Sequence, residues 1–229
     1  MLWFYDYYYL ILVVPAIIIS LIAQANVKST YKKMSAVRNK RNMTGAQAAQ
    51  RVLSACGLAE TIKIYGISGN LTDHYDPKAN VIRLSEGVYN GTSIASIGIA
   101  CHEAGHAIQH AQGYAPIKIR NMILPVANFG SSAGVFIAIL GYFLGYQPIV
   151  NIGIILFSAV VVFQLVTLPV EFNASNRAMK LITENGLLYE DEMPKARKVL
   201  TAAALTYVAA LLVSVMSLLR LILRTNRRR

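Results

Sequence analysis

Acidic residues and cysteines are both scarce in this chain of 229 residues. Asp and Glu together number 11 against 22 Lys and Arg, so the formal net charge is +11. The two cysteines, Cys56 and Cys101, form no Cys-x-x-Cys pair, and two are too few for the disulfide framework of a small secreted domain. We therefore expect both to be free thiols, and a disulfide-stapled fold is excluded.

The excess of positive charge does not predict a nucleic-acid partner. Lys and Arg lie near the ends of apolar segments and do not gather with aromatic residues into one basic face. Nucleic-acid binding favours such a face on a soluble fold, whereas charges that flank apolar segments are typical of membrane topology signals. We interpret the basic residues in this second way.

Apolar sequence is what the chain has in abundance. Hydrophobic residues make up 55% of it and the mean hydropathy is +0.45, which is too apolar for an ordinary soluble domain. Apolar stretches lie at residues 3–25, 121–146, 149–168 and 200–223, each near the length of about 20 residues that a helix needs to cross a bilayer. The expected fold is mainly α and integral to the membrane, with about four membrane helices.

The middle two stretches are typical of a transmembrane hairpin, because only the short uncharged break Gln147-Pro148 separates them. Gly130-x-x-x-Gly134 and Gly141-x-x-x-Gly145 would let helices approach closely there.

The expected division of the chain is an N-terminal membrane anchor at 1–25, a cytoplasmic domain at 26–115, a transmembrane hairpin at 116–168, a helix at 169–198, and a C-terminal membrane helix with a basic tail at 199–229.

The basic residues predict the orientation in the membrane. No Lys or Arg precedes the first apolar stretch, whereas six follow it: Lys28, Lys32, Lys33, Arg38, Lys40 and Arg41. Because cytoplasmic flanks carry the excess of Lys and Arg, we expect an uncleaved anchor with its N-terminus outside, and not a signal peptide. A full crossing by the last helix would place Arg224, Arg227, Arg228 and Arg229 outside, against the same bias; we still expect a crossing, since the bias is not strict.

The segment between the first and second stretches predicts a small mixed domain. Its expected elements are a helix capped by Thr44 and ending at Gly57, a strand at 62–65, a hairpin of strands 71–75 and 81–84, and a helix from Ile94 to about Ala111 capped by Thr92 or Ser93. After the membrane hairpin, Pro169 is expected to open a polar helix and Asp191 to cap the last helix.

The helix expected at 94–111 carries the motif His102-Glu103-Ala104-Gly105-His106. Residues i and i+4 share one face of a helix, so both imidazoles can reach one metal ion. Glu103 lies beside the first histidine, where its carboxylate can hold a water and take its proton. This is the arrangement of a zinc hydrolase, in which the metal acts as a Lewis acid and the glutamate as general base.

A catalytic zinc usually has three protein ligands, and three residues are candidates for the third. His110 lies one turn beyond His106, but three histidines on a straight stripe cannot converge on one ion, so a neighbouring or surface role is expected. His74 falls in the predicted hairpin, as a polar strand residue or on the substrate side. Glu171 is the best candidate.

Topology favours Glu171. Two spans separate it from His106, and the basic flanks (Lys118, Arg120; Arg177, Lys180) put both residues on the cytoplasmic side. Ser175 follows Glu171 by one helical turn, where its hydroxyl can bond to a ligand.

These residues carry a resemblance to a known family. His102-Glu103-x-x-His106, a membrane hairpin and then Glu171-Phe172-x-Ala174-Ser175-x-Arg177 resemble the YugP-like neutral zinc metallopeptidases of bacterial membranes, as do residues 73–77 and 84–91. The plan is similar to HtpX and the CAAX prenyl proteases, whose third ligand is the Glu of an E-F/Y-x-A-D motif; Ser175 stands where those have Asp. The resemblance implies a zincin-like α+β domain of gluzincin type in a membrane-integrated endopeptidase.

The sequence thus predicts a multi-pass cell-membrane zinc metallopeptidase with its active site on the cytoplasmic side and a peptide or membrane-protein substrate. One Zn²⁺ is expected on His102, His106 and Glu171, with Glu103 as general base. Arg177, His74 and Tyr207 all remain candidate donors to the oxyanion, with Ser175 as a supporting residue. The alternatives are a non-catalytic zinc-binding scaffold or pseudoprotease, which the intact motif disfavours, and a zinc hydrolase of a lipid or small amide.

Overall fold

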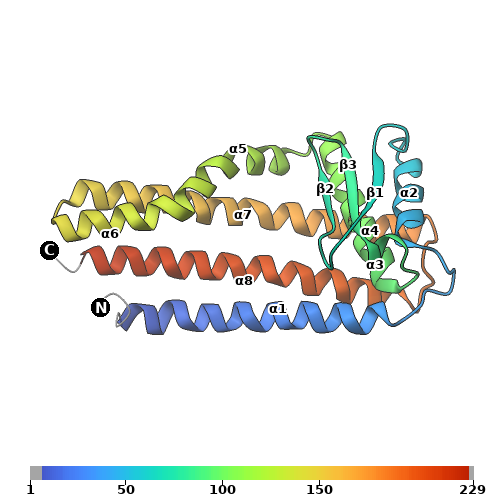
Figure 1. The fold of residues 1–229 in the computed structure, drawn as a ribbon, viewed down its shortest axis with the longest axis horizontal. Coiled ribbons are helices and arrows are strands. Elements are labelled where there is room, and N and C mark those ends of the chain that lie inside the picture. Colours follow the sequence, from blue (N-terminus) through green and yellow to red (C-terminus); the bar gives the residue numbers. More distant parts are fainter. Residues whose placement is uncertain (1–6, 227–229) are drawn as a thin grey trace. The chain divides into compact units, whose positions relative to one another are not determined.

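The computed structural model describes residues 7–226 (Figure 1). The first six residues of the predicted anchor and Arg227 to Arg229 of the basic tail lie outside the described residues. The chain divides into two compact units. We call the first, Met1–Gln24, Ala115–Pro169 and Leu205–Arg229, the helical unit. The second, Ala25–Tyr114 and Val170–Ala204, is the mixed unit.

Four long helical segments supply the helical unit, and each is long and apolar enough to cross a membrane. Their elements are η1 (Tyr9–Val13) with α1 (Val14–Ser35), α5 (Ala115–Phe129) with η2 (Gly130–Gly134) and α6 (Val135–Leu144), α7 (Gln147–Glu184), and α8 (Met193–Asn226). Large apolar side chains point outward: Met122, Phe143 and Ile155 are 70%, 72% and 70% exposed. A surface this apolar needs a lipid environment, so the prediction of four membrane helices is confirmed.

Glycines bring the two helices of the membrane hairpin into close contact. A Cβ atom at Gly130 would collide with the carbonyl oxygen of Leu156, and one at Gly141 would lie 2.6 Å from the backbone nitrogen of Val150. The close approach expected of the glycines is therefore present at Gly130, Gly134 and Gly141, whereas a Cβ added at Gly145 would meet nothing within 4 Å. Gly145 ends α6 in the left-handed conformation (φ 66°), and α7 begins at Gln147, so the predicted break is present but lies just before Gln147-Pro148, which open α7.

The membrane helices are longer than the apolar pattern predicted. α1 continues to Ser35, past the first basic residues, and the second span begins at Ala115 and not near 121. Pro169 does not open a new helix, because α7 runs unbroken from Gln147 to Glu184. A proline removes one backbone hydrogen bond, but breaking the helix there would leave several more backbone groups unpaired near the hydrocarbon. Continuing the helix therefore costs less.

The mixed unit begins with α2 (Gly45–Ala55), which Thr44 caps as predicted, in a capping box with Gln47. Three strands follow: β1 (Lys63–Ile67), β2 (His74–Asp76) and β3 (Val81–Ser85), in the sheet order β1-β3-β2. β2 and β3 are antiparallel, which confirms the hairpin, and β1 is parallel to β3. β2 starts at His74 and not at 71, since Leu71 has a left-handed backbone (φ 56°) that a strand does not accept.

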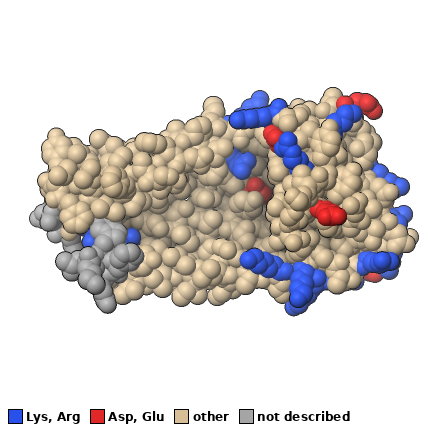
Figure 2. All heavy atoms as spheres, viewed as in Figure 1, with Lys and Arg blue, Asp and Glu red and all other residues tan. Residues whose placement is uncertain are grey.

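Two further helices complete the first part of the mixed unit: α3 (Glu86–Tyr89) and α4 (Ile94–Ala111). The bounds predicted for α4 and its Ser93 cap are confirmed, since the Ser93 side chain accepts a hydrogen bond from the Ser96 backbone N–H. Asp191 does not cap α8, which begins at Met193; its carboxylate pairs with Lys40 at 2.8 Å. On the face shown in Figure 2, charged side chains gather over the mixed unit.

Candidate metal centre

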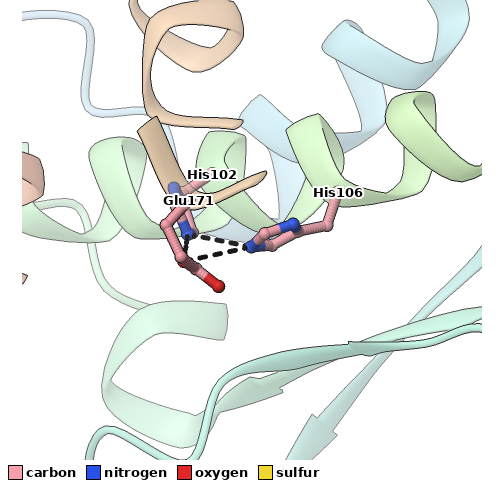
Figure 3. A group of neighbouring side chains, drawn as sticks. All are labelled: His102, His106 and Glu171. Carbon is pink, nitrogen blue, oxygen red and sulfur yellow. Dashed lines mark hydrogen bonds and ion pairs between the residues drawn. The ribbon is translucent and has the colours of Figure 1, made fainter. Parts of the chain in front are cut away.

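α4 is the central helix of the mixed unit, and it presents the two histidines of the motif. Its apolar face packs into the core, with Ile97, Ala100 and Ala104 fully buried. His102 and His106 lie one turn apart on a half-buried face, and their Nε2 atoms are 3.1 Å apart. Figure 3 shows both rings turned toward the same point. The sequence spacing alone accounts for this pairing.

Glu171 reaches the same point from α7 (Figure 3). Its Oε2 lies 3.4 Å from His102 Nε2 and 3.6 Å from His106 Nε2, and the residue is only 4% exposed. Gly105 explains the close approach of the two helices, because a Cβ at this position would lie 2.8 Å from the carbonyl oxygen of Ala174. The glycine within the motif thus brings α7, and Glu171 with it, close to the histidines.

The three ligand atoms fit a tetrahedral zinc ion. All three lie within 4.8 Å of one another. Zinc bonds of about 2.0–2.1 Å in a tetrahedral arrangement place neighbouring ligand atoms about 3.3–3.4 Å apart, and the observed separations of 3.1, 3.4 and 3.6 Å bracket that value. Glu171 Oε2 is buried and has no hydrogen-bond partner among the described residues. A buried carboxylate oxygen without a donor calls for a cation.

Glu103 is buried in the same turn of α4, with 8% of its surface exposed. The two carboxylates act on His106: burial lowers the pKa of this imidazole, but the neighbouring carboxylates of Glu171 and Glu103 outweigh burial, so the pKa is raised. The next residue back, Cys101, is a free and fully buried thiol whose pKa is raised by burial. It is a packing residue of the core, as a protonated thiol is a poor metal ligand.

Two side chains contact the Nδ1 atoms of the histidines, on the side of each ring away from Glu171. Ser175 Oγ lies 3.2 Å from His102 Nδ1. This is the contact with a ligand that the position of Ser175, one helical turn after Glu171, predicted. Gln109 Oε1 lies 3.1 Å from His106 Nδ1, and this contact was missed. Gln109 was not among the candidate residues that the sequence suggested. Its position three residues after His106, on the same helical face, was the signal that could have found it.

The other candidates lie outside the three-ligand cluster. The His110 ring packs edge-on against Tyr75, with ring centroids 5.9 Å apart. His74 is exposed in β2, and its Nδ1 lies 2.8 Å from the carbonyl oxygen of Thr72. Arg177 donates from Nε to Asn173 and from a terminal nitrogen to Gln112, at 2.7 and 2.6 Å. Tyr207 belongs to the helical unit.

Comparison with known proteins identifies the family. The model of the family described as "Putative neutral zinc metallopeptidase" matches residues 9–226. The chain belongs to this family. The resemblance inferred from the motifs is thereby confirmed.

One relative of this metallopeptidase family is the "Putative membrane protease YugP" of Bacillus subtilis (strain 168). It is 46% identical over 215 residues, which cover 94% of this chain and 95% of the relative. No solved structure matches the chain. The family, the four candidate spans and the cluster of His102, His106 and Glu171 agree on a zinc metallopeptidase of the membrane.

Proposed function

We propose that this protein is a membrane-integrated zinc endopeptidase whose metal is held by Nε2 of His102, Nε2 of His106 and Oε2 of Glu171. The observation that supports it most is the buried Oε2 of Glu171, which has no donor among the described residues and faces two imidazole nitrogens at zinc-ligand spacing. Three protein ligands leave a position open, as in catalytic zinc sites, whereas structural zinc sites are closed by four ligands.

The proposed reaction is hydrolysis of a peptide bond. When bound, zinc supplies Lewis acidity that lowers the pKa of a water molecule and polarises the scissile carbonyl. Glu103 takes the proton of that water and passes it to the leaving amine as the carbon–nitrogen bond breaks. Its burial in the same turn as the two histidines supports this role, because it places the carboxylate beside the proposed metal, within reach of a water bound there.

The chain's own groups must also hold the substrate and its developing oxyanion. The guanidinium of Arg177 already donates to Asn173 and Gln112, which makes it a less suitable oxyanion donor than the sequence suggested. β2 is an edge strand of the sheet and packs against the metal-binding helix through Tyr75 and His110. An extended peptide can pair with its free edge, so we place the substrate backbone there.

Two substitutions test the proposal on purified protein. Glu103→Gln keeps all three ligands, so we expect one zinc per chain and no cleavage of an unfolded protein such as casein. Glu171→Gln removes the charge of the ligand but keeps the shape of its side chain. We expect zinc affinity to fall by about 100-fold or more, because even the loss of a residue that hydrogen-bonds to a ligand typically lowers metal affinity 10–100-fold. Gln50→Met, an exposed change on α2, serves as control.

Each assay has an outcome that contradicts the proposal. Cleavage by zinc-loaded Glu103→Gln at the rate of the unmodified protein would exclude Glu103 as general base. Zinc bound by the unmodified protein with no cleavage of any peptide would favour a non-catalytic scaffold. Unchanged zinc affinity in Glu171→Gln would exclude the third ligand.

A further inference from the structure

Gln109 is a fully buried polar residue that makes three hydrogen-bond contacts in the mixed unit. Its Oε1 lies 3.1 Å from His106 Nδ1. Its Nε2 donates to the carbonyl oxygen of Val170 at 2.8 Å and to Asn173 Oδ1 at 2.9 Å. One side chain on α4 therefore touches a ligand ring and, on α7, the backbone of the residue directly before Glu171.

The partners of Gln109 fix the direction of each bond. Arg177 is a donor only, so the Asn173 atom that it contacts at 2.7 Å must be the acceptor oxygen. That oxygen, and the carbonyl of Val170, can only accept, so the Gln109 atom facing both must be the NH₂ group.

The remaining atom of Gln109 determines the state of the histidine. Its Oε1 can only accept, so His106 Nδ1 must carry a proton. With the proton on Nδ1, the lone pair of the neutral ring lies on Nε2, the atom that faces Glu171 at 3.6 Å.

We infer that Gln109 is a positioning residue of the metal centre, which holds His106 in the Nδ1–H form that offers Nε2 to zinc and ties that ligand to the segment of α7 carrying Glu171. This inference rests on the proposed function, because it assigns a role toward the metal of that site. Among the residues that the structure describes, His102 Nδ1 contacts only the hydroxyl of Ser175, at 3.2 Å. A hydroxyl can donate or accept, so it does not fix the ring in the same way.

A merely structural glutamine would satisfy the same three contacts without affecting the metal, and two substitutions separate these roles. Gln109→Met keeps the length but removes every hydrogen bond. Gln109→Glu keeps an acceptor for His106 Nδ1 but replaces the NH₂ group with an oxygen, which loses both donors to α7 and faces the two acceptor oxygens there. Gln50→Met, an exposed change on α2, is the matched surface control. The measurement is zinc affinity of the purified full-length protein, by competition with a chromogenic chelator.

We expect zinc to bind Gln109→Met 10–100-fold more weakly than the unmodified protein, because this variant loses the acceptor that contacts His106, and Gln109→Glu to bind zinc more tightly than Gln109→Met, because it keeps that acceptor. Affinity unchanged in Gln109→Met, or lowered equally in both variants, would overturn the inference. If the unmodified protein itself bound no zinc, the proposed function would fail, and that result is distinct from an effect confined to Gln109.

A second measurement needs no variant and stands even if Gln109→Met does not fold. The chain has only four histidines, so nitrogen-15 labelling of histidine in the zinc-loaded protein gives four ring systems to assign. We expect the His106 ring to carry its proton on Nδ1, protected from exchange with solvent. A proton on Nε2 of His106, or metal bound through Nδ1, would overturn the inference.

Discussion

At the scale of single residues, the two histidines proposed as metal ligands differ in the side chain that contacts their Nδ1 atoms. His106 is held by a buried amide whose orientation is fixed by its other partners. His102 is held by the hydroxyl of Ser175. A neutral hydroxyl accepts a weaker hydrogen bond than a carboxylate does, so His102 gains less basicity from its neighbour. The two proposed ligands are thus supported unequally.

Two substitutions of Ser175 are expected to change zinc affinity in opposite directions. Ser175→Ala removes the contact with His102 Nδ1, and we expect zinc affinity to fall about 10-fold. Ser175→Asp places a carboxylate behind the ring, and we expect affinity to rise, because a charged acceptor strengthens the hydrogen bond and makes Nε2 more basic. Chelator competition on both variants measures this. Equal affinities in the two would show that the residue behind His102 does not affect the metal.

At the scale of elements, the crossing of α4 and α7 places Glu171, and Gly105 determines how close the helices come. Gly105→Ala would put a Cβ 2.8 Å from the carbonyl oxygen of Ala174, so the helices must separate. We expect a lower unfolding temperature and weaker zinc binding. Gly98 in the same helix is the matched control, because the nearest atom to its added Cβ would be 3.8 Å away.

Gly98→Ala should be neutral or stabilising, by up to about 1 kcal/mol from helix propensity. Thermal unfolding and chelator competition on both variants check the pair. Loss of zinc affinity in Gly98→Ala as large as that in Gly105→Ala would mean that helix separation is not the cause.

The β2–β3 hairpin contains an ion pair that responds to pH. The Arg83 guanidinium, with the turn amides of Ala79 and Lys78, lowers the pKa of Asp76 from 3.8 to about 2. A depressed carboxyl pKa stabilises the fold fully above the unfolded value near 4, and this stabilisation is lost as pH falls toward 2.

We therefore expect Asp76→Asn to unfold at lower denaturant than the unmodified protein at pH 6, and the gap to narrow between pH 4 and pH 2, where Asp76 becomes protonated. Urea unfolding followed by circular dichroism at several pH values measures the gap. A gap that does not change over this range would exclude the titration of Asp76 as its source.

How far the sequence predicts these elements depends on whether their determinants are local. The bounds of α4 follow from Ser93 and from the left-handed Gly113 just beyond its end, both local signals. Pro169 is a local signal as well, yet the cost of exposing backbone groups near lipid overrides it. The parallel pairing of β1 with β3 has no local signal, because alternation predicts a strand and not its partner.

The same distinction applies to the site. His102 and His106 are one turn apart in one helix, so spacing predicts their approach. Glu171 has no such local signal, and its place was inferred through topology, as the residue on the same side of the membrane after two spans, and through the family resemblance. The contacts of Gln109 join residues 61 and 64 positions apart, and no periodicity in the sequence reports such a pairing.

At the scale of the whole molecule, orientation in the membrane is the remaining proposal. Lys and Arg flank the segments that carry the site, so the positive-inside bias places the mixed unit in the cytoplasm and the turn between α6 and α7 outside. Two exposed residues report on these places: Ser68 in the mixed unit and Tyr146 in the turn. Both native cysteines are changed to serine, and one cysteine is introduced at either position.

We expect a membrane-impermeant thiol reagent to label Tyr146→Cys in intact cells and Ser68→Cys only after the membrane is opened. Labelling of both cysteines after the membrane is opened shows that neither thiol is buried in the protein. A cysteine that is not labelled in intact cells therefore lies on the cytoplasmic side of the membrane. Labelling of Ser68→Cys in intact cells would place the metal centre outside. Equal protection of both positions would mean that an even number of crossings separates them, because an odd number puts them on opposite sides of the bilayer.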